Sequence, residues 1–183
     1  MKMKEKAREI TALPALPVPD RDHIQGPIDA PIKLLEYGDY ECPYCGQAYP
    51  VVKEIQKRLG KRLCFAFRNF PLINSHPNAE HAAEAAEAAA VQGRFWEMHD
   101  VLFENQEALE DRDLARYAAA LGLDAQRLIS EVSSGAHVLR VREDFHSGAR
   151  SGVNGTPTFF INGARYNGPA QFEELLEALV DSV

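Results

Sequence analysis

The stretch IKLLEYGDYECPYC, residues 32–45, decides the fold of this chain. Its first six residues are mostly apolar and lie between a proline and a glycine, two residues that interrupt regular structure. This pattern predicts a short buried strand that leads directly to Cys42 and Cys45. Two thiols three positions apart can close into a disulfide and reopen, so the motif indicates a redox site.

A helix of roughly four turns is predicted after the first thiol. Apolar side chains recur there at helical spacing before the stop signal Gly60; they are Val51, Val52, Ile55 and Leu59. Pro43 suits the first helical turn, where a missing N–H costs nothing. Cys42 then lies at or next to the N-cap, where unpaired N–H groups and the helix dipole stabilise a thiolate. We therefore predict that Cys42 is the nucleophile and that Cys45, one turn further in and less exposed, is the resolving thiol.

The same spacing also occurs in zinc sites, which need two more Cys or His ligands. The only other cysteine is Cys64, and His76 and His81 are five positions apart, so these two do not share a helix face. The sequence therefore favours redox chemistry and predicts no metal and no cofactor. Cys64 lies in an apolar segment and is predicted to be a buried small side chain.

Composition limits the classes of partner. With 183 residues, 45% of them hydrophobic, the chain can bury the core of one domain that carries an insertion. The net charge of −7 and the lack of a basic stripe argue against nucleic acid as a partner. No apolar run approaches the roughly 20 residues that span a bilayer, so no membrane insertion is predicted. No heptad pattern stands out, which predicts a monomer.

The first six residues are basic, as at the start of a secretory signal, but three prolines interrupt the next segment. The pattern therefore predicts no complete signal peptide. The sequence as it stands therefore predicts a cytoplasmic location, or a periplasmic or other extracytoplasmic one if a leader has been removed.

Further along the chain, the aromatic segment 63–70 is short enough to be a strand, so that strand, helix and strand imply a parallel pair with a right-handed crossover. A long helical block comes next, rich in alanine at 82–90, and its acidic residues Glu80, Glu84 and Glu87 are predicted to form one solvated helix face. Strand signals return at 156–161, where Asn162-Gly163 predicts a hairpin before a last amphipathic helix. The predicted division is an extended tail over 1–25, a βαβ…ββα domain formed by 26–75 and 151–183, and an inserted all-helical subdomain over 76–150.

Four motifs, in this order, carry a resemblance to a known family. They are EYGDYECPYCG at 36–46, HPNA at 76–79, GRFWEMHD at 93–100 and GVNGTPTF at 152–159. The chain resembles the DsbA-like thiol-disulfide oxidoreductases over roughly residues 26–182. The resemblance implies an α/β thioredoxin fold with a helical subdomain inserted before the last two strands.

The resemblance also implies roles for single residues. Cys42 matches the attacking cysteine and Cys45 the buried one. Pro157 matches a proline that follows a cis peptide bond and lies against the disulfide, which leaves the backbone of Thr156 free to pair with an extended substrate. Glu36 matches a buried acid that exchanges a proton with Cys45, although a solvent-facing Glu36 is the alternative. The expected substrate-binding residues are Pro43, Tyr44, Thr156 and Pro157.

The expected activity is exchange of the Cys42–Cys45 disulfide with cysteine-containing proteins or peptides, followed by recycling through an unidentified redox partner. Tyr44 stands where the family's best-known oxidase has a histidine, and Glu41 adds a negative charge beside Cys42. Both features predict an oxidant weaker than DsbA, near the potentials of about −200 to −230 mV found for glutaredoxins. A thioredoxin-like reductase or isomerase and a redox-inactive peptide-binding module are the alternatives. A glutathione transferase is disfavoured by the second cysteine.

Overall fold

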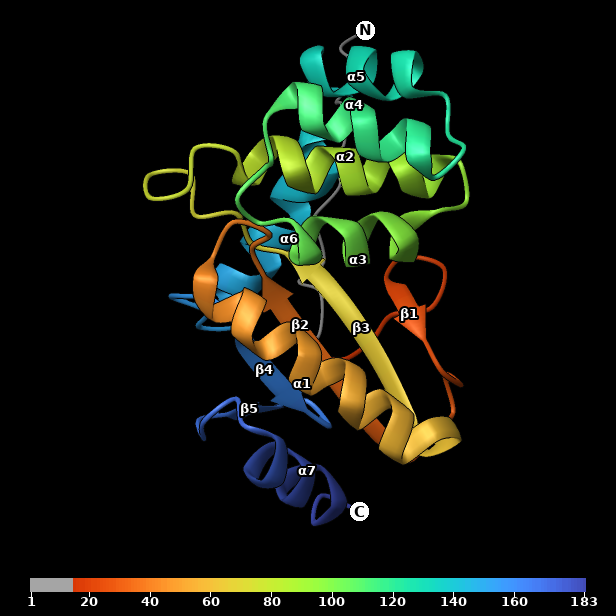
Figure 1. Cartoon of the computed structure of the whole chain (residues 1–183). Coiled ribbons are helices and arrows are strands. Elements are labelled where there is room, and N and C mark those ends of the chain that lie inside the picture. The colour runs from red at the N-terminus through yellow and green to blue at the C-terminus, as the bar shows by residue number, and fades with distance from the viewer. Residues whose placement is uncertain (1–14) are drawn as a thin grey trace, which may run out of the picture.

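The computed structural model describes residues 15–183, so the first 14 residues of the predicted tail lie outside the described part. Five strands form one sheet in the order β1-β3-β2-β4-β5 (Figure 1). The strands are β1 His23–Gln25, β2 Ile32–Gly38, β3 Leu63–Asn69, β4 Thr158–Ile161 and β5 Ala164–Tyr166. β2 and β3 pair in parallel, as predicted, and the other neighbours are antiparallel.

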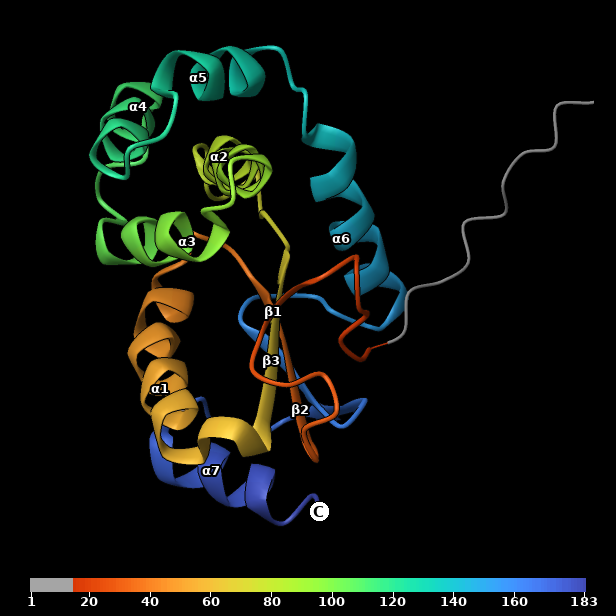
Figure 2. The same ribbon diagram turned by 90° about the vertical axis from the view of Figure 1, so that its right-hand side faces the viewer.

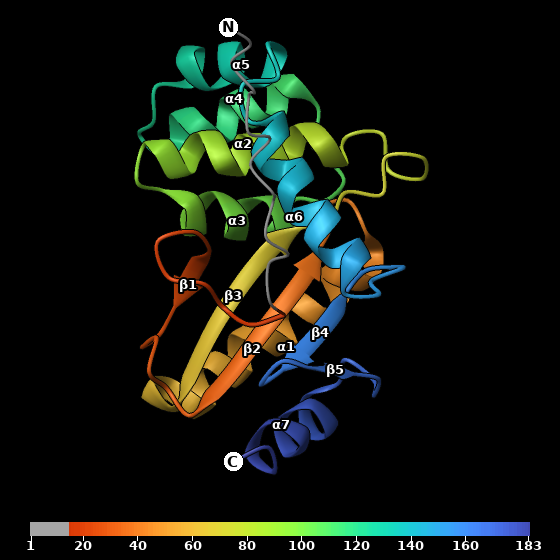
Figure 3. The same cartoon turned by 180° about the vertical axis from the view of Figure 1, so that it is seen from behind.

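Some helices pack on the two faces of the sheet, and others pack on one another. The helices are α1 Pro43–Leu59, α2 Ala79–Val91, α3 Phe95–Glu104, α4 Asp111–Ala120, α5 Ala125–Ser133, α6 Val138–Arg150 and α7 Phe172–Val180, with a 3₁₀ turn at Gly60–Arg62. α1 and α7 lie on one face, and α6 lies on the other (Figures 2 and 3). Helices α2 to α6 come between β3 and β4, so the predicted order of βαβ, helical block and ββα is confirmed. No helix within residues 15–183 combines the length and apolar character needed to cross a membrane.

Side-chain alternation along the two long strands creates two cores, one on each face of the sheet. On the α1 side, Leu34, Phe65 and Phe67 join the apolar residues of α1, α7 and the helical insertion. On the α6 side, Leu35 and Tyr37 pack with a smaller group that includes Phe70 and Val153. Adjacent residues of β2 therefore belong to different environments, which separates two sets of buried polar groups.

The sequence predicted an extended tail over residues 1–25, but the described part of that segment, residues 15–25, is not simply extended. Residues 23–25 form β1, which pairs antiparallel with β3. Asp22 accepts two hydrogen bonds from the fully buried guanidinium of Arg68, at 3.0 Å from Nε and 2.7 Å from Nη2. A buried guanidinium needs an anionic partner, and the N-terminal segment supplies it. A strand of three residues is too short to show the alternation of apolar and polar side chains by which a strand is predicted from sequence.

The predicted solvated acidic face of α2 is also wrong. Glu84 and Glu87 are only 3% and 4% exposed, because α3, α4, α5 and α6 surround α2. Glu87 accepts hydrogen bonds from Asn69 Nδ2 at 2.8 Å and shares one with His23 Nε2 at 3.0 Å. Residues distant in the sequence thus hydrogen-bond a side chain whose helical spacing suggested solvent.

Candidate active site

Cys42 occupies the N-cap of α1, and Pro43 follows in the first turn. Its φ and ψ of −72° and 122° are extended, as an N-cap requires. The backbone N–H of Cys42 donates to the Asp39 carbonyl at 3.2 Å, and the carbonyl of Cys42 accepts from the N–H of Gly46 at 3.1 Å. The predicted nucleophile therefore lies at the positive end of the longest helix.

The pKa of the Cys42 thiol is lowered to about 5. The largest cause is a hydrogen bond from the Cys45 thiol, which outweighs partial burial, and the backbone N–H groups of Cys45 and Tyr44 add to the effect. Cys42 Sγ lies 3.4 Å from the carbonyl oxygen of Thr156. At neutral pH the sulfur of Cys42 is a thiolate, the form that attacks disulfides.

Cys45 lies deeper in the fold and has the opposite character. Burial, then the hydrogen bond to Cys42, then the negative charge of Glu36 raise its pKa well above the ordinary range. The backbone N–H of Asp39 lies 3.5 Å from its sulfur. The exposed fractions, 0% for Cys45 and 3% for Cys42, differ less than the sequence suggested. What distinguishes the two sulfurs is the stronger effect of burial on the Cys45 pKa and the direction of the hydrogen bond between them, which lowers the pKa of Cys42 and raises that of Cys45. All three cysteines of the chain are free thiols in this structure.

Glu36 is buried, with 3% of its surface exposed, so the solvent-facing alternative is wrong. It lies on β2 between Phe67 and Phe159 of the neighbouring strands. Burial, and secondarily the charge of Cys42, raise the pKa of its carboxyl to about 8. A carboxyl with this pKa carries a proton at neutral pH and can release it when a nearby charge changes.

The loop before β4 completes the surroundings of Cys42. The Thr156–Pro157 peptide bond is cis. A groove of about 490 Å³ opens beside it, and its walls include Tyr44, which is 67% exposed, together with Thr156 and Pro157. The hydroxyl oxygen of Thr156 is buried without a hydrogen-bond partner among the described residues. Three of the four predicted substrate-binding residues thus line one groove. Pro43 is exposed at the start of α1.

Several site residues were not predicted as such. The Asp39 carboxylate accepts hydrogen bonds from the backbone N–H groups of Glu41 and Leu72, both at 2.8 Å, and pairs with His76 Nδ1 at 2.7 Å. Burial lowers the pKa of His76, but the hydrogen bond and charge of Asp39, and then the charge of Cys42, raise it overall. Asp39 is three positions before Cys42, and this closeness in the sequence is the signal by which Asp39 could have been predicted as a site residue.

Two polar contacts tie the motif to the helical insertion. Asn78 donates to the Glu41 carboxylate from its backbone N–H at 2.7 Å and from its side chain at 2.9 Å. Gln106, between α3 and α4, donates to the carbonyl oxygens of Tyr40 and Cys42, each at 2.8 Å. Gln106 stands in a connecting segment without a motif, so no sequence signal points to it.

Within residues 15–183, no group of three or more His, Cys, Asp or Glu side chains is arranged to hold a metal ion. The thiols themselves carry the chemistry that the geometry supports. A stabilised thiolate lies over a buried protonated thiol, beside a carboxyl that titrates near neutrality. On this α/β framework, such a dithiol defines the class of thioredoxin-fold thiol-disulfide oxidoreductases.

Comparison with known proteins gives the family. A family model described as Thioredoxin matches residues 19–181, and the chain belongs to this family. BdbD from Bacillus subtilis superposes with a TM-score of 0.83 at 24% identity, over 93% of this chain and 97% of that one. The catalytic domain of Proteus mirabilis ScsC superposes with a TM-score of 0.78 at 17% identity, over 92% of both chains. At these identities the likeness establishes the fold, which is the DsbA-like one with a helical insertion.

Closer sequence relatives carry a different name. The Na(+)/H(+) antiporter NhaA 3 of Salinispora tropica is 46% identical over 164 residues, which are 90% of this chain but 25% of the relative. The antiporter NhaA of Herminiimonas arsenicoxydans is 42% identical over 165 residues, again 90% of this chain and 26% of the relative. The chain thus spans about a quarter of the length of these curated relatives.

These relatives overturn the prediction of a cytoplasmic location. That prediction rested on the first residues of the sequence. The region shared with the antiporters is one part of a much longer protein, so the start of this sequence does not report the compartment. The prediction was therefore wrong.

Proposed function

We propose that this protein is a dithiol oxidase of moderate strength, which transfers the Cys42–Cys45 disulfide to pairs of thiols in polypeptide substrates. The contrast between the two thiols carries this proposal. The pKa of Cys42 lies near 5, whereas that of Cys45 lies well above the ordinary thiol value. A stabilised thiolate at Cys42 favours the reduced form of the pair, and a favoured reduced form makes its disulfide an oxidant.

The first step is attack by a substrate thiolate on the Cys42 sulfur of the disulfide. A bond forms between the two sulfurs, the Cys42–Cys45 bond breaks, and its electron pair leaves on Cys45. The Cys45 thiolate is unfavourable in its buried position, so it takes a proton. Glu36 interacts electrostatically with both thiols, and its carboxyl carries a proton at neutral pH, so it is the proton donor.

In the second step, another substrate thiolate attacks the substrate sulfur of the mixed disulfide. The bond to Cys42 breaks, and Cys42 leaves as the stabilised thiolate. The substrate gains a disulfide, and the two electrons reside in the enzyme dithiol. An oxidising partner must then accept these electrons before the next cycle. The same steps in reverse reduce or isomerise disulfides.

The substrate class follows from the groove beside Thr156. A peptide in extended conformation can pair with the backbone of Thr156 as an added strand, because β-augmentation needs only main-chain groups. The exposed Tyr44 ring offers apolar contact, and the groove of about 490 Å³ offers space, to side chains on either side of the substrate cysteine. These features support unfolded or flexible polypeptides as substrates.

The pKa of Cys42 also supports moderate strength. The value of about 5 lies between the roughly 3.5 of DsbA and the roughly 7 of thioredoxin. We therefore expect an equilibrium potential against glutathione of about −200 to −230 mV. A potential near −270 mV would instead indicate a reductase, and one near −120 mV an oxidase as strong as DsbA.

A stoichiometric assay tests the activity directly. The oxidised protein is mixed with a reduced peptide that contains two cysteines, and formation of the peptide disulfide is followed. Cys42→Ser should reduce the rate to that of the peptide alone, because the sulfur that is attacked is gone. Cys64→Ser is the matched control and should keep the full rate. An unmodified protein that binds the peptide without oxidising or reducing it would be a peptide-binding module, and the proposal would fail.

A further inference from the structure

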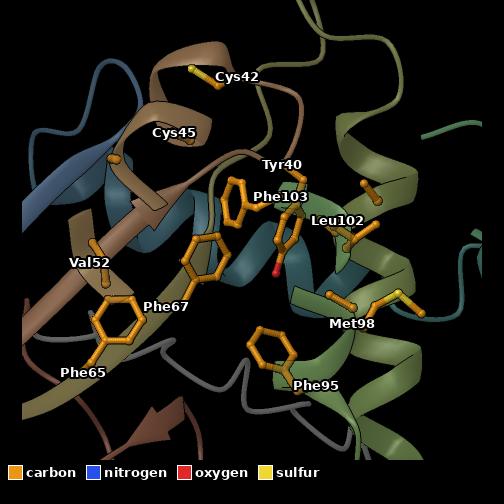
Figure 4. Close-up of a cluster of buried hydrophobic side chains, with 14 of the residues drawn as sticks. Tyr40, Cys42, Cys45, Val52, Phe65, Phe67, Phe95, Met98, Leu102 and Phe103 are labelled. Carbon is orange, nitrogen blue, oxygen red and sulfur yellow. The ribbon is translucent and has the colours of Figure 1, made fainter. Parts of the chain in front are cut away.

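Gln106 of the helical insertion hydrogen-bonds the backbone of the reacting cysteine. Its amide nitrogen donates to the carbonyl oxygens of Tyr40 and Cys42, each at 2.8 Å. The Tyr40 ring also packs against Phe103 of α3, with ring centroids 4.9 Å apart (Figure 4). An apolar contact and a forked hydrogen bond are thus among the contacts that attach the turn before α1 to the insertion.

The second observation comes from α1 itself. Gly46 lies in the first turns of this helix, where glycine is less favourable than alanine. A Cβ atom at this position would lie 1.9 Å from Gln106 Oε1 and 2.7 Å from Gln106 Cδ. The side chain of Gln106 can keep its position only if residue 46 has no side chain. The glycine and the glutamine therefore form a matched pair.

We propose that Gln106 is a positioning residue through which the helical insertion sets the oxidising strength of the Cys42–Cys45 pair. This inference rests on the proposed function of that pair. Gln106 offsets the negative ends of two carbonyl groups in the turn that carries Cys42, those of Tyr40 and of Cys42 itself. It also fixes the turn from which the N–H groups of Tyr44 and Cys45 point toward the same sulfur. Both effects favour the thiolate of Cys42 over its thiol.

The test uses Gln106→Met, which keeps the length of the side chain and removes the donor. We expect the pKa of Cys42, measured by thiolate absorbance, to rise by about one unit. The equilibrium constant with glutathione should change about tenfold toward a weaker oxidant, which corresponds to about 30 mV. Gly46→Ala should produce the same changes by displacing Gln106, and this variant is expected to fold because alanine favours helices. The double variant should differ little from either single one, because both changes remove the same contact.

Gln92→Ala is the matched control. Gln92 also bridges two helices of the insertion, since its Oε1 accepts from the backbone N–H of Asp124 at 2.8 Å, but it lies outside the cysteine turn. This variant should lower the melting temperature and leave the potential unchanged. The proposal is overturned if Gln106→Met and Gly46→Ala keep the original Cys42 pKa and potential, or if their effects add in the double variant. Absorbance reports the Cys42 pKa even in a protein without oxidase activity, so failure of the proposed function would be recognised separately.

Discussion

Two adjacent residue pairs of β2 and β3 bury charge in opposite ways. Glu36 lies beside Phe67 on the α1 face, and Tyr37 lies beside Arg68 on the α6 face. Arg68 is paired with Asp22, whose pKa is raised by burial but lowered overall by the hydrogen bond and charge of Arg68. Burial and the charge of Cys42 both act against ionisation of Glu36, and its pKa rises to about 8.

The difference shows how one sheet serves both structure and chemistry. A buried charge with an opposite partner can hold distant segments of the chain together. A buried acid whose largest influences all disfavour ionisation titrates near neutrality and is available to move a proton. The α6 face contains further paired charges, such as Arg140 and Asp144 at 2.6 Å. We expect substitutions of the buried ionisable residues on the α6 face to change stability, and substitution of Glu36 on the α1 face to change reactivity.

The largest effect should follow from Arg68→Met. This change leaves the Asp22 carboxylate buried without its main cation and should lower the free energy of unfolding by about 3–5 kcal/mol. The glutathione potential of the molecules that stay folded should not change, because Arg68 belongs to the other face of the sheet. Denaturant unfolding and redox equilibrium measure the two quantities.

The control for this prediction is Arg112→Met. Arg112 pairs with Glu110 at 3.1 Å, but its side chain is 80% exposed, so the loss should be below about 1 kcal/mol. Equal losses in the two variants would contradict the distinction between buried and exposed pairs. A shift of the potential in Arg68→Met would contradict the separation of the two faces.

The next effect concerns Glu36→Gln, which cannot transfer a proton. We expect the rate of disulfide transfer at neutral pH to fall about 100-fold, at an unchanged equilibrium potential. The pKa of Glu36 is higher in the folded protein than its ordinary value of 4.5, so the unfolded chain releases the proton first as the pH rises. Glu36 should therefore decrease stability progressively from about pH 4.5 to about pH 8, by at most about 1.4 kcal/mol per pH unit.

Stability measured across this pH range checks the sign. Glu36→Gln should remove most of the decrease, and both proteins are best compared in a Cys42→Ser background, which eliminates the thiolate charge. A variant that retains the full pH slope would show that Glu36 is not the group responsible.

The smallest effect is expected for His76→Gln. Glutamine can still bind Asp39 but carries no charge, so the thiolate of Cys42 loses a nearby cation. The Cys42 pKa should rise by roughly half a unit. His81→Gln is the control, because His81 also pairs with an aspartate, Asp111 at 2.6 Å, but that pair is exposed and lies outside the site. An unchanged Cys42 pKa in His76→Gln would remove His76 from the electrostatics of the site.

The features that the sequence predicted correctly depend on local patterns. A cysteine after a strand and before a helical repeat must lie at a helix start, and this placed Cys42. Glu87 was misassigned because helical spacing describes a face but not what covers it; its partners His23 and Asn69 lie 64 and 18 positions away. Gln106 has the same character, since its contacts with Tyr40 and Cys42 span more than sixty residues and follow no period. Contacts between single polar residues far apart in the chain produce no periodic pattern in the sequence, so they cannot be predicted from it.

The order of the strands has a consequence for behaviour in concentrated solution. Exposed sheet edges offer unpaired backbone groups to other chains and promote aggregation. Here the two seven-residue strands lie inside the sheet, and the outermost strands β1 and β5 contain three residues each. The sheet thus presents little edge on which copies of the protein could polymerise.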